Sequence, residues 1–319
     1  MKIEPAKLTK IIEQNYSHLM PDFFEMQTEY LASLNIIYHD LDASLVAMVL
    51  TSQLYKHTVQ NQKNEKISLK YFYERENFNL PVTNLKIKEI SKILNLPRET
   101  VRRKKEKLIK DNLIILNNKS KMYSLNTKMI EQQIIELQIS NLSKFLSKFS
   151  YYFSKNRFFV KEVTREEIKK DVEQKFLIYL TKFLDFQISY FAKCKTLLDI
   201  ESVFIVLLCS LNSTVQYKNK DQPVNAKETF KRIGVMKGTL GLNATSISEI
   251  TKVPRTTVLR KIAQLEKIGL LKKDKFKRYS SVDFTKLNNY KKIESLVEYN
   301  VKLLGIFFSD CLETYTRKN

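Results

Sequence analysis

A gapless internal repeat constrains this chain more than any other feature. With an offset of 157 residues, positions 90–114 (ISKILNLPRETVRRKKEKLIKDNLI) align with positions 247–271 (ISEITKVPRTTVLRKIAQLEKIGLL), and 12 of the 25 positions are identical. The chain has 319 residues, which is little more than two such periods. We therefore expect two copies of one module in tandem, with domains at 1–157 and 158–319.

Positive charge is concentrated around the repeat. The chain has 55 basic and 34 acidic residues, a formal net charge of +21. Residues 86–121 contain 12 basic and 4 acidic residues, and residues 243–278 contain 10 and 3. Local charge of this kind attracts a polyanion and releases its counterions. A lysine-rich codon bias explains the abundance of lysine, but it does not explain why the excess lies beside the repeat.

Each copy of the repeat predicts a short helix, a turn and a second helix. Pro97 and Pro254 begin the second helices, at a position where the missing N–H of proline would have no partner anyway. These helices, 97–110 and 254–267, place valine and leucine on one side and basic residues on the other. The pattern is typical of a recognition helix that enters the major groove of DNA.

Arg103 and Arg260 occupy the same position on the outward face of the two predicted helices. A guanidinium group can donate twice to guanine, so we predict that these two side chains contact bases. Side chains of the first turn lie beside free backbone N–H groups and are suited to phosphate. The predicted DNA-contacting set on the helices is Arg98, Thr100, Arg102, Arg103, Lys107, Arg255, Thr256, Thr257, Arg260 and Lys261.

A basic hairpin follows each predicted recognition helix. The helices are predicted to end at Asn112 and Gly269, the residue types that best tolerate the left-handed conformation. Two short strand-like segments follow in each copy, and the second hairpin is one residue shorter than the first. We expect each hairpin to be a wing along the DNA, with contacts from Lys119, Lys121, Lys275, Lys277 and Arg278. With their wings, the two copies span residues 86–126 (repeat A) and 243–283 (repeat B).

Long apolar helices are predicted on both sides of each repeat. Residues 42–60 align with 199–216, and amphipathic helices are expected at about 128–155 and 290–315. The apolar residues of these amphipathic helices form wide stripes. Helices with such stripes usually pack on other helices, and the expected partners are the terminal helices of the opposite half. The alternative, in which each half buries its own stripe, stays open. The polar connectors 61–84 and 217–242 receive no assignment. The predicted fold class is mainly α, with two tandem winged helix-turn-helix domains, small β-wings and long packing helices in a pseudo-two-fold arrangement.

The two copies differ at one position on the apolar side of the second helix. Repeat B has Ile262 at this position, whereas repeat A has Lys105. A lysine at such a position must extend its stem along apolar surface toward a polar environment, or the helix must tilt differently. Because the outward residues also differ, we expect the two copies to prefer different half-sites.

Other kinds of chemistry find no support in the sequence. The histidines and cysteines lack metal-ligand spacing, and no GxxxxGK[ST] phosphate-binding motif is present. We therefore predict no enzymatic activity, no cofactor and no metal site. The scattered cysteines fit a reducing compartment, and no apolar run is long enough for a bilayer, so we expect a cytoplasmic protein without a membrane partner. The aromatic run 149–153 indicates packing, with a ligand pocket as the alternative.

The phrases PRETVRRK and PRTTVLRKI…LEKIGLL resemble the recognition helix and exit turn of bacterial winged helix-turn-helix transcriptional regulators. The order and length of the flanking helices resemble the MarR-type arrangement, although that family normally has one such unit per subunit. The resemblance implies a sequence-specific regulator of double-stranded DNA, here a single-chain pseudo-dimer that contacts successive major grooves.

Two other functions stay open. A plasmid-type replication initiator also has tandem winged-helix domains, and a structural module would bind protein. The sequence does not specify a small-molecule effector, nor whether the chain is a monomer or forms a further homodimer.

Overall fold

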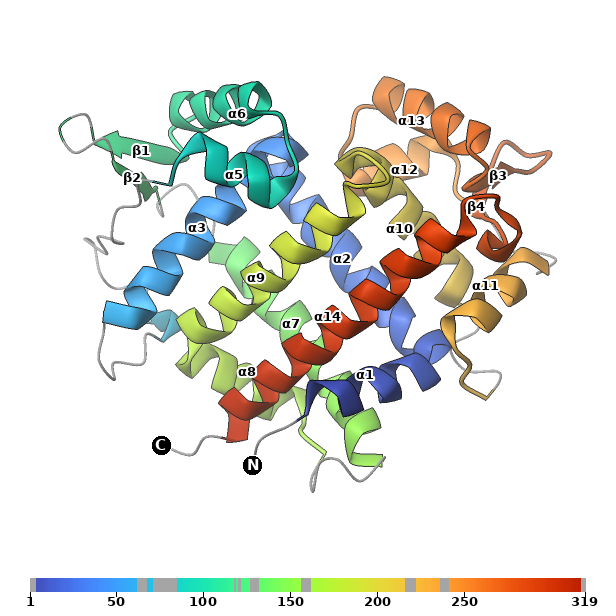
Figure 1. Cartoon of the computed structure of the whole chain (residues 1–319), viewed down its shortest axis with the longest axis horizontal. Coiled ribbons are helices and arrows are strands. Elements are labelled where there is room, and N and C mark those ends of the chain that lie inside the picture. Colours follow the sequence, from blue (N-terminus) through green and yellow to red (C-terminus); the bar gives the residue numbers. More distant parts are fainter. Residues whose placement is uncertain are drawn as a thin grey trace. The chain divides into compact units, whose positions relative to one another are not determined.

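The structure, a computed structural model, describes residues 4–61, 68–70, 85–117, 119, 122–126, 132–155, 162–215, 222–235 and 241–316. Lys121 and most of the connector 61–84 lie outside these residues, whereas most of the connector 217–242 is described and contains a helix. Over the described part the chain is mainly helical, and its strands form two small antiparallel sheets (Figure 1). The prediction of a mainly α fold is confirmed.

The two halves contain their elements in a similar order. The first half has α1 (Pro5–Gln14), α2 (Tyr16–Tyr38), α3 (Leu41–Asn61), α5 (Ile87–Leu94), α6 (Arg98–Lys110), β1 (Ile114–Asn117), β2 (Met122–Leu125) and α7 (Gln132–Lys155). The second half has α8 (Arg165–Gln174), α9 (Phe176–Cys194), α10 (Ile200–Thr214), α11 (Ala226–Val235), α12 (Ala244–Thr251), α13 (Arg255–Lys267), β3 (Leu271–Lys273), β4 (Tyr279–Ser281), η3 (Phe284–Lys286) and α14 (Tyr290–Thr316). The sequence offset carries α5 and α6 onto α12 and α13 residue for residue.

Two compact units make up the chain, and they differ from the two sequence halves. The first consists of residues 1–3, 37–196 and 307–319, and the second consists of residues 4–36 and 197–306. Helices α8 and α9 therefore belong with repeat A, whereas α1 and most of α2 belong with repeat B. The boundary at 157/158 separates the two copies of the sequence repeat. It does not separate the compact units, because the N-terminal helices of each half belong to the unit that contains the repeat of the other half.

In the first compact unit, α3 lies between α9 and α6. The Ser52 hydroxyl and the Lys56 ammonium group of α3 both bind the Asp185 carboxylate of α9, each at 2.7 Å. At the other end of α3, Lys195 pairs with Asp42 at 2.6 Å. The helix beneath α6 is thus fixed by polar contacts at both ends.

The predicted C-terminal amphipathic helices meet in this unit. Phe308 of α14 stacks on Phe149 of α7, with ring centroids 4.2 Å apart, and both side chains are fully buried. This contact joins a terminal helix of one half to a terminal helix of the other, as expected for the wide apolar stripes. It also confirms that Phe149 and Phe153 belong to packing, since both are 0% exposed.

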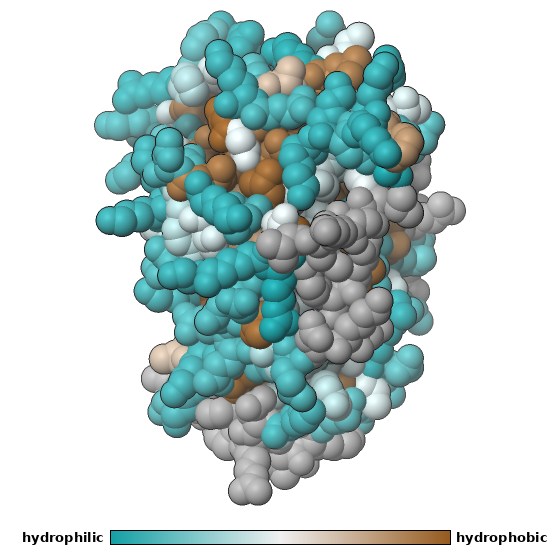
Figure 2. Space-filling view, turned by 90° about the vertical axis from the view of Figure 1, so that its right-hand side faces the viewer, coloured by the Kyte–Doolittle hydropathy of each residue, from teal (hydrophilic) through white to brown (hydrophobic). Residues whose placement is uncertain are grey.

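In the second compact unit, α10 packs against α13, α12 and β4, and α11 packs against η3. Asn35 of α2 donates to the Thr251 carbonyl at the end of α12, at 3.1 Å. Figure 2 shows the face that carries β3, β4 and α11: hydrophilic side chains predominate among its described residues, and a group of hydrophobic residues lies in its upper part.

Among the helices that the structure describes, none is by itself both long enough and apolar enough to cross a bilayer, and α2 with α3 meets the requirement only as a bent pair.

Gly241 lies where the backbone of β4 passes closely. Leu242 and Tyr279 form an antiparallel bridge, with N–H donating to carbonyl oxygen in both directions at 2.9 and 2.8 Å. A Cβ at position 241 would lie 2.8 Å from the Tyr279 carbonyl oxygen, and backbone atoms cannot move aside cheaply. We expect Gly241→Ala to lower the free energy of unfolding by about 1–3 kcal/mol, measured by urea denaturation. The exposed Ser295→Ala serves as control, and equal stability of the two variants would contradict the argument.

Candidate nucleic-acid interface

The turn between the two helices is built in the same way in both repeats. The Ser91 hydroxyl donates to the Leu96 carbonyl at 2.6 Å, and the Ser248 hydroxyl donates to the Val253 carbonyl at 2.7 Å. Each bond ties the first helix to the residue just before the proline that precedes the second helix. The turn is therefore held by an identical local hydrogen bond in two places separated by the sequence offset.

Left-handed residues end the helices at matching positions. Asn95 and Lys252 end the first helices with φ of 51° and 58°. Asn112 and Gly269 follow the second helices with φ of 55° and 79°. The prediction that the second helices end in left-handed residues is confirmed at both positions.

The second helices bury the predicted face. Val101 and Leu108 of α6 are fully buried, and so are their counterparts Val258 and Leu265 of α13. Each helix begins one residue later than predicted, with the proline immediately before it. The opposite face is consequently turned to solvent.

Most of the predicted DNA-contacting residues lie on that outer side. Arg103 and Arg260 are both exposed and form no salt bridge with the described residues. The exposed members of the predicted set are Arg98, Arg102, Arg103, Lys119, Arg255, Thr256, Arg260, Lys275 and Lys277, and the half-buried members are Thr100, Lys107, Thr257 and Arg278.

Arg102 is exposed but already paired. Its guanidinium group binds Glu99 and Glu106, with the shortest N–O distance to each carboxylate at 2.6 Å. The hydrogen bond from Arg102 lowers the pKa of Glu99, so this carboxyl stays ionised. Repeat B has Leu259 at the equivalent position and lacks this triad. The outer face of α6 is therefore charge-balanced around Arg102, whereas that of α13 is not.

Lys107 and Lys261 are placed differently from the other predicted contacts. Lys107 binds Asp111 at 2.6 Å and the Tyr38 carbonyl at 3.3 Å. Lys261 is only 7% exposed and binds Asp199 at 2.7 Å and Glu201 at 3.4 Å. Because its ammonium group points to the start of α10, Lys261 is removed from the predicted DNA-contacting set.

This anchor is a feature that the sequence reasoning missed. Lys104, the counterpart of Lys261, binds Asp40 just before α3 at 2.6 Å. In both repeats a lysine of the second helix thus pairs with a carboxylate at the start of the apolar helix beneath it. The available signal was a lysine identical in both copies together with an acidic residue at the start of each apolar helix.

Replacing Lys261 with methionine is expected to lower the free energy of unfolding by about 1–2 kcal/mol at neutral pH, because both carboxylates keep solvent contact. Burial raises the pKa of Asp199, but bonds from Lys261 and the Ser202 backbone outweigh it and lower the pKa to about 2. The ionised carboxylate therefore stabilises the fold above the ordinary pKa, near 4, and loses this contribution as the pH falls toward 2.

Urea denaturation at pH 7 and pH 3 checks both expectations. The stability difference between the wild type and Lys261→Met should shrink at pH 3, while the exposed control Lys267→Met should stay close to the wild type. Equal differences at the two pH values would contradict the anchor.

The hairpins have the predicted difference in length. Leu116 pairs with Tyr123 in one sheet, and Lys273 pairs with Tyr279 in the other, so the connection is one residue shorter in repeat B. At the tip of this hairpin Phe276 is 64% exposed, with Lys275 and Arg278 near its ring. The sequence reasoning did not single out Phe276.

Lys105 has an aromatic partner. It is only 6% exposed, and its Nζ lies 3.6 Å from the centroid of the Tyr123 ring on β2. The lysine therefore extends across the hairpin to a tyrosine face, a favourable position for a cation. Its counterpart Ile262 is buried as predicted.

The described residues contain no group of three or more His, Cys, Asp or Glu side chains placed to hold a metal ion. Cys194, Cys209 and Cys311 are buried free thiols. Comparisons with protein-family models, curated proteins and solved structures find no match to this chain.

Proposed function

We propose that the protein is a sequence-specific regulator of transcription that binds double-stranded DNA in the cytoplasm. One observation carries the proposal: the same exposed arginine, Arg103 or Arg260, stands on the outer face of the second helix in both repeats. Each helix follows a tight turn and precedes a basic hairpin. These are the parts of a winged helix-turn-helix, and two copies in one chain act as a single-chain pseudo-dimer.

In the proposed complex, α6 and α13 enter successive major grooves, about 34 Å apart along the duplex. Arg103 and Arg260 contact guanine, while first-turn residues such as Arg98 and Arg255 contact phosphate. Because α6 carries the Glu99–Arg102–Glu106 triad and α13 does not, the two half-sites differ. The target is an imperfect inverted repeat.

Selection of bound fragments from the host genome, followed by footprinting, tests this function. We expect two protected half-sites about one helical turn apart, located in promoters. Protection of one short site by one repeat alone would contradict the pseudo-dimer. Enrichment of an origin with direct repeats would favour a replication initiator instead.

The wing lysines provide a separate prediction. Lys275 and Lys277 are exposed at the tip of the β3–β4 hairpin and are suited to phosphate. Replacing both with alanine should weaken binding to specific and unrelated duplexes alike, and should reduce the salt slope by roughly two. Fluorescence anisotropy over a series of KCl concentrations measures both effects. The exposed control Lys291→Ala on α14 should leave the slope unchanged. A loss of affinity confined to the specific duplex would contradict contacts between these lysines and the DNA phosphates.

A further inference from the structure

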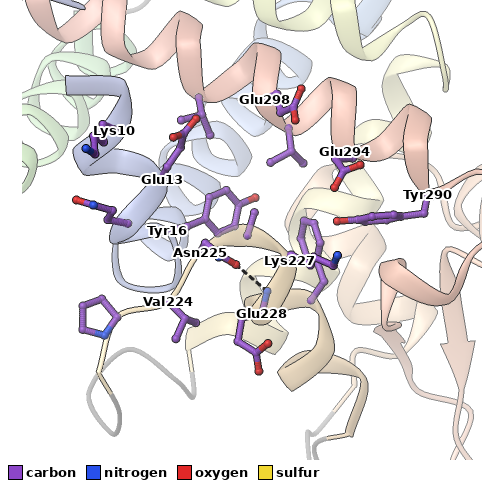
Figure 3. Close-up of a pocket in the computed structure, with 16 residues that line it drawn as sticks. Lys10, Glu13, Tyr16, Val224, Asn225, Lys227, Glu228, Tyr290, Glu294 and Glu298 are labelled. Atoms are coloured by element: carbon purple, nitrogen blue, oxygen red, sulfur yellow. Dashed lines mark hydrogen bonds between the residues drawn. The ribbon is translucent and has the colours of Figure 1, made fainter. Parts of the chain in front are cut away.

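The second compact unit contains a pocket of about 730 Å³. It lies between α1, the start of α2, the segment before α11, and the first turns of α11 and α14 (Figure 3). None of its lining residues belongs to repeat B. Its volume is in the range of pockets that hold small molecules.

Three aromatic side chains, those of Tyr16, Phe230 and Tyr290, form part of the lining. The Tyr16 and Phe230 rings meet edge to face, with centroids 6.0 Å apart. In Figure 3 the hydroxyl groups of Tyr16 and Tyr290 point toward the middle of the pocket from opposite sides. Burial raises the pKa of both phenols, that of Tyr290 to about 12 with help from its hydrogen bond to Glu294. Both therefore remain neutral at physiological pH.

The Tyr16 hydroxyl has no hydrogen-bond partner among the described residues, although the side chain is only 4% exposed. The oxygen is not among the fully buried side-chain atoms that lack a partner, so it is accessible from the open space of the pocket. Since this hydroxyl points into the pocket, a ligand with a polar group would satisfy it.

The charge of the pocket is opposite to that of the chain. Its lining contains four glutamates and two lysines, whereas the whole chain has a net charge of +21. Glu13 approaches from α1, and Glu294 and Glu298 approach from α14, while the Glu228 carboxylate points away (Figure 3). Carboxylates beside aromatic faces favour a cation, because both present negative potential to it.

One wall of the pocket is fixed by hydrogen bonds. The Ser17 N–H donates to the Val224 carbonyl, and the Val224 N–H donates to the Ser17 hydroxyl, both at 3.0 Å. Asn225 caps α11 by accepting from the Glu228 N–H, also at 3.0 Å. This cap already engages a free N–H of the first turn, which reduces the attraction of α11 for an anion.

We propose that this pocket binds a small organic cation with an apolar body. The ammonium group lies among Glu13, Glu294 and Glu298, and the apolar body lies against the tyrosine and phenylalanine rings. Aromatic faces of this kind recognise ammonium ligands through cation–π attraction. The site goes beyond DNA binding and requires no contact with DNA.

Isothermal titration of the full-length protein without DNA tests the proposal. The probes are 2-phenylethylammonium, 2-phenylethanol and phenylacetate, which share one body and carry a positive, neutral or negative head. We expect the cation to bind at least about tenfold more tightly than the other two, a difference of about 1.4 kcal/mol. No saturable binding of the cation, equal binding of the three probes, or a preference for phenylacetate would overturn the proposal.

The double variant Glu294→Gln/Glu298→Gln keeps shape and hydrogen-bonding capacity but removes two charges. It should weaken binding of the cation at least tenfold and leave 2-phenylethanol unchanged. Glu249→Gln, on the exposed face of α12, is the matched control and should bind like the wild type. Unchanged cation affinity in the double variant would refute the site. DNA binding is measured separately, so failure of either proposal leaves the other standing.

Discussion

Replacing Arg103 and Arg260 together with alanine is expected to remove about 2–6 kcal/mol of discrimination between the target and unrelated DNA. Each guanidinium group is exposed and unpaired by any described carboxylate, so it is available for a bidentate contact with guanine. Each single variant should lose about 1–3 kcal/mol, at one base position only. Competition binding with duplexes substituted at each position measures the loss and maps it.

Lysine variants separate geometry from charge. Arg103→Lys with Arg260→Lys keeps the charge but loses the planar fork, so discrimination should fall while binding to unrelated DNA stays near the wild-type value. Lys170→Ala removes one exposed charge on α8 and controls for the loss of positive charge in each single alanine variant. If the alanine variant lost affinity equally for all duplexes, the two arginines would be phosphate contacts rather than base contacts.

Replacing Phe308 with alanine is expected to lower the free energy of unfolding by about 3–5 kcal/mol. The side chain is fully buried, stacks on Phe149 at 4.2 Å between ring centroids, and lies 5.2 and 5.5 Å from Phe145 and Phe153. Truncation of Phe308 would leave a cavity among the other three rings and would remove the contacts that Phe308 makes with them. Urea denaturation followed by circular dichroism at the helix band measures the loss.

Ile306 on the same helix is the matched control, because it is 47% exposed. Ile306→Ala should change the free energy of unfolding by no more than about 0.5 kcal/mol. A small effect of Phe308→Ala would show that the α7–α14 contact does not stabilise the first compact unit.

The local parts of the two repeats were predictable. Pro97 and Pro254 mark the starts of the second helices, and Asn112 and Gly269 mark their ends. These positions depend on the conformational preferences of single residues and on neighbours within one turn of helix. The offset then transfers each assignment from one copy to the other.

Long-range pairing was not predictable in the same way. Lys261 and Arg260 are adjacent and both basic, yet one pairs with Asp199 and the other faces solvent. Lys105 reaches the ring of Tyr123, which the helix pattern could not identify. Such partners come from segments far apart in the chain, and only their packing decides which side chain meets which.

The sequence by itself determined the duplicated helix–turn–helix, the helix ends and the basic hairpins, because each depends on short-range backbone and charge preferences. Only the tertiary structure decided that α1 and α2 join the unit of repeat B, that Lys261 is an anchor, and that Tyr16 lines an acidic pocket. The hydrophobic effect does not depend on the order of segments along the chain, so the apolar face of a helix can be buried against either repeat. The choice between the copies is settled by how the helices pack.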